Sequence, residues 1–134
     1  MTIKLAKDSI DLAIVTNRLE EMTHFYRDVL GFEDCGQIAT RSTPGGMVGQ
    51  LKCGTSLIKL VRYPKLSTEG LPKGLGHSGY RYWTISVTNL DEVVEACERA
   101  GTLVVAPIKH ISPEIRIAIV EDPDGNLVEF LSHC

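Results

Sequence analysis

Apolar residues form short continuous runs in some parts of the chain and recur every three to four positions in others. A short run followed by a segment with the longer period occurs twice. A short apolar run over 10–15 leads into an amphipathic segment over 19–30, and a second run over 82–87 leads into another segment over 90–100. Apolar residues three and four positions apart predict helices in the amphipathic segments, whereas the short runs predict strands. Each half of the chain is therefore expected to begin with a strand followed by a helix.

The ends of the two predicted helices carry matching signals. Asn17 and Asn89 each precede a glutamate by three positions, which is the spacing of a capping box. Gly31 and Gly101 follow the helices, where a positive φ is favoured. The two asparagines are 72 positions apart (89 − 17 = 72) in a chain of 134 residues, so the sequence predicts two copies of one module.

Short β-like runs separated by turn residues fill the rest of each half. Pro44-Gly45-Gly46 and Asp122-Pro123-Asp124-Gly125 predict tight turns. The predicted strands are 32–40, 47–53 and 56–62 in the first half, and 102–106, 115–121 and 126–132 in the second. Each half then reads βαβββ. We expect a single α+β domain, with modules over about 8–62 and 80–133 joined by a linker over 63–79.

Composition narrows the class of protein. The chain is 43% hydrophobic, but no apolar run approaches the roughly 20 residues of a membrane span, and the N-terminus lacks a signal-peptide pattern. A net charge of −3 gives no electrostatic footprint for nucleic acid. The four cysteines form no CxxC pair, which suits a reducing cytoplasm, and Cys97 lies on an apolar helix face where a core residue is expected.

Two longer motifs point to a family. The run 24–32 (HFYRDVLGF) and the run 120–129 (VEDPDGNLVE), together with the βαβββ duplication, resemble the vicinal oxygen chelate superfamily. Glyoxalase I, the bleomycin and fosfomycin resistance proteins and the extradiol dioxygenases belong to this superfamily. The resemblance implies two βαβββ modules whose sheets curl into a cup, with a divalent metal at its bottom in the catalytic members. It implies the fold and not the reaction, because one scaffold hosts many chemistries.

The resemblance also implies a metal-ligand position on the first and last strands of each half. In this sequence those positions fall on Asp11, Lys59, Tyr82 and Glu129. A protonated lysine has no lone pair, and a tyrosine offers only a phenol with a pKa of about 10. Two carboxylates beside an ammonium group suit Zn²⁺, Ni²⁺ or Fe²⁺ poorly, since these ions favour imidazole and thiolate. We therefore expect no bound metal and no other cofactor.

The histidines do not change that expectation. His24 lies in a predicted helix, His77 in the linker, and His110 and His133 at strand ends. His77 would reach a ligand position only if the strand register were shifted. No His-x-x-His pair is present, so the four side chains are expected to be dispersed.

Strand alternation gathers the polar candidates on one side. Period-two alternation places Lys59, Tyr82 and Glu129 on the faces turned away from the helices, and it places Arg116 there as well. The predicted ligand-contacting residues are Asp11, Lys59, Tyr63, Tyr82, Arg116 and Glu129. In the structural alternative, Lys59 only neutralises one or two semi-buried carboxylates.

Two classes of function stay open. The first is a metal-free binding protein that holds or sequesters a small metabolite or drug. The second is a lyase, isomerase or dioxygenase acting on a small oxygenated substrate. In either class Tyr82 is expected to donate a hydrogen bond, Glu129 or Asp11 to act as general base, and Lys59 or Arg116 to stabilise an enolate or hold an anionic group. Metal-dependent glyoxalase I activity is not expected. A homodimer is expected in either case, because a half-open cup leaves sheet edges uncovered.

Overall fold

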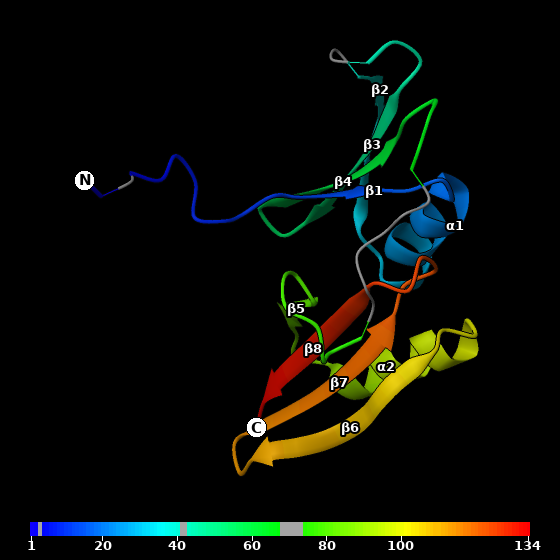
Figure 1. Ribbon diagram of the computed structural model, residues 1–134. Coiled ribbons are helices and arrows are strands. Elements are labelled where there is room, and N and C mark those ends of the chain that lie inside the picture. The colour runs from blue at the N-terminus through cyan, green and yellow to red at the C-terminus, as the bar shows by residue number, and fades with distance from the viewer. Residues whose placement is uncertain (3, 41–42, 68–73) are drawn as a thin grey trace. The chain divides into compact units, whose positions relative to one another are not determined.

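The computed structural model describes residues 1–2, 4–40, 43–67 and 74–134, and its chain divides into two compact units, Met1–Ser67 and Thr68–Cys134. Each unit contains a four-stranded mixed sheet, visible in Figure 1. The strand orders, β1-β4-β3-β2 and β5-β8-β7-β6, are the same when counted within each unit. The predicted α+β fold with a repeated βαβββ module is therefore confirmed.

The first unit follows the predicted order of elements. Its elements are β1 (Leu12–Val15), α1 (Leu19–Thr23), η1 (His24–Val29), β2 (Glu33–Ala39), β3 (Met47–Cys53) and β4 (Ser56–Arg62). Strand β1 pairs in parallel with β4, and β3 is antiparallel to both of its neighbours. A parallel pair needs a crossover, and here the helix, β2 and β3 provide it.

The second unit repeats this plan, and its strand β6, with 9 residues, is longer than the equivalent strand β2, with 7. Its elements are β5 (Tyr82–Ser86), α2 (Leu90–Arg99), β6 (Val104–Ser112), β7 (Ile115–Glu121) and β8 (Leu127–His133). The run 102–106 was expected to end near Ala106, but β6 continues to Ser112 and so includes His110. Pro107 is tolerated because β6 is an edge strand whose register shifts between Ala106 and Lys109.

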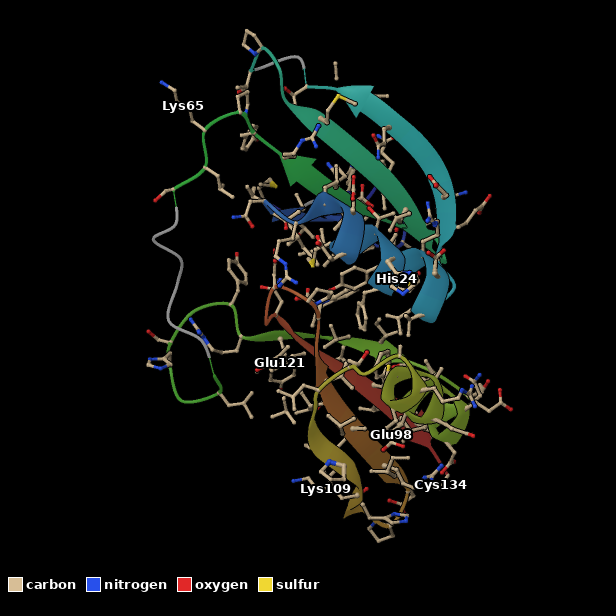
Figure 2. The ribbon with its side chains drawn as sticks, turned by 90° about the vertical axis from the view of Figure 1, so that its right-hand side faces the viewer. His24, Lys65, Glu98, Lys109, Glu121 and Cys134 are labelled. Atoms are coloured by element: carbon tan, nitrogen blue, oxygen red, sulfur yellow. The ribbon has the colours of Figure 1, made fainter. Side chains whose placement is uncertain are left out.

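Each helix buries one apolar stripe. In α2 the buried residues Leu90, Val94 and Cys97 are spaced by four and three positions, as the helical period requires. In Figure 2 this helix lies along one face of the sheet of its own unit. In the first unit, Phe25 and Tyr26 of η1 are both buried and their rings meet edge to face, with centroids 4.8 Å apart. Cys97 is a core residue, as predicted.

The helix of the first unit contains one extra residue. From Leu19 to Gly31 there are 12 steps (31 − 19 = 12), and from Leu90 to Gly101 there are 11 (101 − 90 = 11). The extra residue is accommodated by the wider π-helical turn of η1, where Leu30 N donates to the carbonyl five positions earlier. Both glycines have a positive φ, 82° and 77°, as predicted.

The predicted capping boxes are wrong. Helix α1 is preceded by Arg18 and not Asn17, and neither cap residue bonds the helix backbone through its side chain. Thr16 Oγ1 instead accepts a hydrogen bond from Arg18 N, and Asn89 Nδ2 donates to the side chain of Glu92 at 3.2 Å. The true caps, Arg18 and Asn89, are 71 positions apart (89 − 18 = 71), so the repeated Val-Thr-Asn string is displaced by one residue between the copies.

Two further expectations concern the linker and the membrane. Residues 68–73 of the predicted linker 63–79 lie outside the described residues. Among the helices of the described part, none has the length and apolar character needed to cross a membrane.

Candidate functional site

A nearly buried carboxylate lies in the middle of the second unit's sheet. Glu129 of β8 is 9% exposed and pairs with Thr84 of β5 on one side and with Ile119 of β7 on the other. The Thr84 hydroxyl donates to Glu129 Oε1 at 2.9 Å. Tyr82 lies two residues before Thr84, hence on the same face, and is half exposed. This face therefore presents an acid, a hydroxyl and a phenol.

The surroundings of this carboxylate are mostly aliphatic. Ile117, Ile119 and Leu127 share its face of the sheet and are buried. Burying a carboxylate is costly unless it is hydrogen-bonded, and Thr84 supplies the one hydrogen bond that it accepts among the described residues. The second oxygen of Glu129, Oε2, therefore accepts no hydrogen bond within the described residues.

The structure places Arg116 on the opposite face, contrary to the sequence prediction. Arg116 pairs with Ser132 of β8, whereas Glu129 pairs with Ile119, so their side chains lie on different faces. Its guanidinium donates to both carboxylate oxygens of Asp91, in the first turn of α2, at 3.3 and 2.8 Å. Arg116 therefore fastens the helix to the sheet and is not a ligand-contacting residue on the face of Glu129.

The first unit carries a positive charge at the corresponding place. Lys59 of β4 is half-buried between Ala13 of β1 and Gln50 of β3. Its sheet neighbours Ile58 and Leu60 are buried on the other face, so Lys59 points away from α1, as the alternation predicts. Among the described residues, Lys59 has neither an ion pair nor a side-chain hydrogen bond.

Asp11 lies just before β1, and its carboxylate is already engaged. Asp11 Oδ1 accepts a hydrogen bond from Leu57 N at 2.8 Å and forms an ion pair with Lys7. The Lys7 ammonium, followed by the Leu57 amide, lowers the pKa of Asp11 below its usual value, and Lys59 contributes least. Tyr63 follows the end of β4 and is half-buried.

Lys59 and Glu129 occupy equivalent positions in the two modules. Val15 pairs with Val61, and Ser86 pairs with Leu131, at the ends of the two parallel strand pairs. Each charged residue lies two positions before the β4 or β8 member of its pair. The duplicated position therefore carries an ammonium in one module and a carboxylate in the other.

Taken one at a time, the side chains at the implied ligand positions are poor ligands for a transition metal. Within the described residues, no group of three or more His, Cys, Asp or Glu side chains gathers as a metal site would require. Asp11 is paired with Lys7, Lys59 offers no lone pair while protonated, and Glu129 is bonded by Thr84. The histidines add nothing: His24 lies 3.1 Å from Asp28 on an exposed surface of its helix.

Two polar residues that were not among the predicted site residues lie on the sheet faces that carry Glu129 and Lys59. Thr84 bonds Glu129, and Gln50 is the cross-strand neighbour of Lys59. Each is a polar residue inside an otherwise apolar strand, on the face away from the helix. That pattern was visible in the sequence, but only the strand register shows which charged residue each one accompanies.

Comparison with known proteins agrees with this fold. The model of the Glyoxalase/Bleomycin resistance protein/Dioxygenase superfamily matches residues 10–130. No curated protein matches the chain. A glyoxalase family protein from Bacillus cereus is similar in structure, with a TM-score of 0.82 at 17% identity, covering 98% of this chain and 96% of that one.

Two other solved structures are similar over nearly their whole length. The fosfomycin resistance protein FosX from Listeria monocytogenes, solved with Mn(II) and sulfate, has a TM-score of 0.68 at 14% identity, covering 98% of this chain and 95% of that one. A lactoylglutathione lyase from Agrobacterium tumefaciens has a TM-score of 0.65 at 22% identity, covering 96% of each chain. Identities this low establish only a common fold. From the family match, this chain belongs to the glyoxalase/bleomycin resistance protein/dioxygenase superfamily.

Proposed function

We propose that the protein binds a small metabolite or drug without a stoichiometric transition metal. The ligand is held by polar side chains on the sheet faces that the helices do not cover. The observation that carries this proposal is the charge at the equivalent positions. An ammonium at Lys59 and a carboxylate at Glu129 can each hold a polar group of a ligand, whereas a protonated lysine cannot ligate a metal ion.

The second unit supplies the better-defined half of the proposed site. Glu129 is fixed by the Thr84 hydroxyl and flanked by aliphatic side chains, which suits a ligand with an apolar body and a hydrogen-bond donor. Tyr82 offers a phenol and an exposed ring on the same face. For the first unit we propose Asp11, Lys59 and Tyr63 as ligand-contacting residues. We propose a homodimer as the assembly and the cytoplasm as the location.

A metal-independent enzyme is the second candidate, and the geometry of Glu129 favours it specifically. One oxygen is held by Thr84, which leaves the other to take a proton from a substrate. Tyr82, on the same face of the sheet, would donate a hydrogen bond to the oxygen of the enolate and so stabilise its negative charge. The reaction class is then a lyase or isomerase reaction on a 2-oxo or otherwise enolisable compound.

Metal content and ligand binding together test the proposal. Elemental analysis of the purified protein is expected to find much less than one Zn²⁺, Ni²⁺, Fe²⁺ or Mn²⁺ per chain. A thermal-shift screen of metabolites and drugs, including bleomycin and fosfomycin, is expected to yield a ligand. Glu129→Gln should weaken its binding, whereas Glu114→Gln, at an exposed position in the β6–β7 turn, should not.

Activity assays separate the two candidates. A glutathione hemithioacetal and enolisable 2-oxo acids serve as test substrates. Turnover that is lost in Glu129→Gln and insensitive to chelator would establish the enzyme. One metal ion per chain, removable by chelator with loss of an activity, would refute the metal-free proposal.

A further inference from the structure

Lys59 and Gln50 form a pair of donors on the open face of the first unit's sheet. They are register partners on the antiparallel strands β4 and β3, so their side chains leave the same face as direct cross-strand neighbours. Such neighbours have Cβ atoms about 5 Å apart. Both are half-buried, and both lie in interior strands of the four-stranded sheet.

The hydrogen-bonding groups of these two side chains are unused within the protein. Neither the Lys59 ammonium nor the Gln50 amide has a hydrogen-bond or ion-pair partner among the described residues. The nearby carboxylate of Asp11 does not change this, because its charge is balanced by Lys7. A half-buried ammonium without a counter-ion is unfavourable, so this position favours an anion brought from outside.

The other cross-strand neighbour of Lys59 is small and exposed. Ala13 of β1 is its register partner on the far side, and this side chain is a single methyl group. An ammonium has three donors and a primary amide has two, whereas an oxyanion offers only acceptors. The row Ala13, Lys59 and Gln50 thus combines two donor groups with an open flank.

We propose that this row binds an oxyanion group of the ligand, a carboxylate or a phosphoryl group, between Lys59 Nζ and Gln50 Nε2. The assignment rests on the proposed small-molecule binding function. It adds that the part of the ligand beside Lys59 and Gln50 is anionic. A planar carboxylate and a tetrahedral phosphoryl group share the required acceptors.

Titrations of the intact protein with sodium acetate and with inorganic phosphate test the assignment. Sodium chloride holds the ionic strength constant, and two-dimensional NMR follows the Gln50 side-chain amide and the backbone amides of β3 and β4. We expect these signals to shift and saturate. A stronger response to acetate identifies a carboxylate site, and a stronger response to phosphate identifies a phosphoryl site.

Three variants and one control locate the binding. Lys59→Met should weaken it by about tenfold or more, because a charge-assisted hydrogen bond is lost, and Lys59→Arg should retain it. Gln50→Leu should weaken it without changing the net charge. Lys52→Met, at an exposed position on β3, should bind as the wild type does.

The outcomes separate this inference from the proposed function. Absence of saturable shifts, or equal loss in Lys52→Met and Lys59→Met, overturns the anion site. Anion binding that is retained in Glu129→Gln supports a site in the first unit. If acetate binds at Lys59 while no screened ligand depends on Glu129, the proposed function fails and the anion site stands.

Discussion

The hydroxyl of Thr84 donates a hydrogen bond to Glu129 across the parallel strands β5 and β8. The equivalent pair in the first unit is Ala13 and Lys59, which cannot form such a bond. The equivalent position thus carries a carboxylate that accepts a hydrogen bond in one module, and an ammonium without such a bond among the described residues in the other.

Thr84→Val is predicted to lower the free energy of unfolding by about 1 kcal/mol, because it removes the one hydrogen bond that Glu129 accepts within the described residues. Thr84→Ser keeps the hydroxyl and should recover most of that loss. Urea unfolding of the three proteins measures the difference. Equal stability of the valine and serine variants would show that the hydrogen bond does not matter.

The double variant Lys59→Glu with Tyr82→His is predicted to create a metal site, if the four implied ligand positions converge. It replaces an ammonium and a phenol with a carboxylate and an imidazole, both of which bind Mn²⁺, Zn²⁺ or Ni²⁺. Without metal it should melt below the wild type. Added metal should raise its melting temperature, since a ligand at 100 times its Kd stabilises by about 2.7 kcal/mol.

A displaced double variant provides the control for this metal test. Lys52→Glu with Tyr80→His makes the same chemical changes at exposed positions outside the proposed site. It should not respond to metal. If both double variants melt alike and ignore every ion, the side chains of Asp11, Lys59, Tyr82 and Glu129 do not meet.

The ion pair between Arg116 and Asp91 is predicted to make stability pH-dependent. The Arg116 guanidinium lowers the pKa of Asp91 below its ordinary value of 3.8. A carboxyl group whose pKa is lower in the folded state stabilises the protein above its ordinary pKa, and this contribution is lost as the pH falls through the folded value. Asp91→Asn should therefore be less stable than the wild type at neutral pH, and this difference in stability should narrow as the pH falls below 3.8.

A neighbouring acid distinguishes this ion pair from a general effect of the helix terminus. Glu92 lies in the same first turn of α2 and accepts its hydrogen bond from Asn89 instead of an arginine. At neutral pH, urea unfolding should show a smaller change in the free energy of unfolding for Glu92→Gln than for Asp91→Asn. An equally large change would assign the effect to the helix dipole.

Cys97 is predicted to be unreactive in the folded protein. Its side chain is fully buried, and burial raises the pKa of its thiol to about 11. A thiol-reactive disulfide at about pH 8 should label the exposed Cys35 and Cys134 rapidly and Cys97 only after unfolding. Mass spectrometry of the labelled peptides checks this order. Rapid labelling of Cys97 would show that α2 opens readily.

The sequence was sufficient for most of the fold because the local signals agreed. Gly31 and Gly101 ended the helices as expected, and the turns flanking β3 and β8 divided the apolar runs correctly. Local signals predicted the wrong residue where the position of an element depends on how it pairs with the rest of the fold. Asn17 resembled Asn89 in sequence, yet Arg18 precedes the helix, because the strand and the helix that follow set where the turn falls.

The candidate site was less predictable from the sequence for a related reason. Strand β7 has apolar residues on both faces, so alternation alone could not show that Arg116 faces the helix. The pairing of Arg116 with Ser132 decides this, and pairing depends on a residue far along the chain. For the same reason, the sequence alone did not predict that Thr84 pairs with Glu129 or that Gln50 pairs with Lys59.

The wide turn of η1 has a consequence for how such a duplicated chain can diverge. An insertion within a regular α-helix rotates every later side chain by about 100° around the axis, which would carry a buried ring to the surface. Here the added residue is absorbed within one turn, Phe25 and Tyr26 remain buried, and Gly31 still ends the helix. At the C-terminal end of this helix, the two copies can therefore differ in the number of residues while their sheets keep the same strand order.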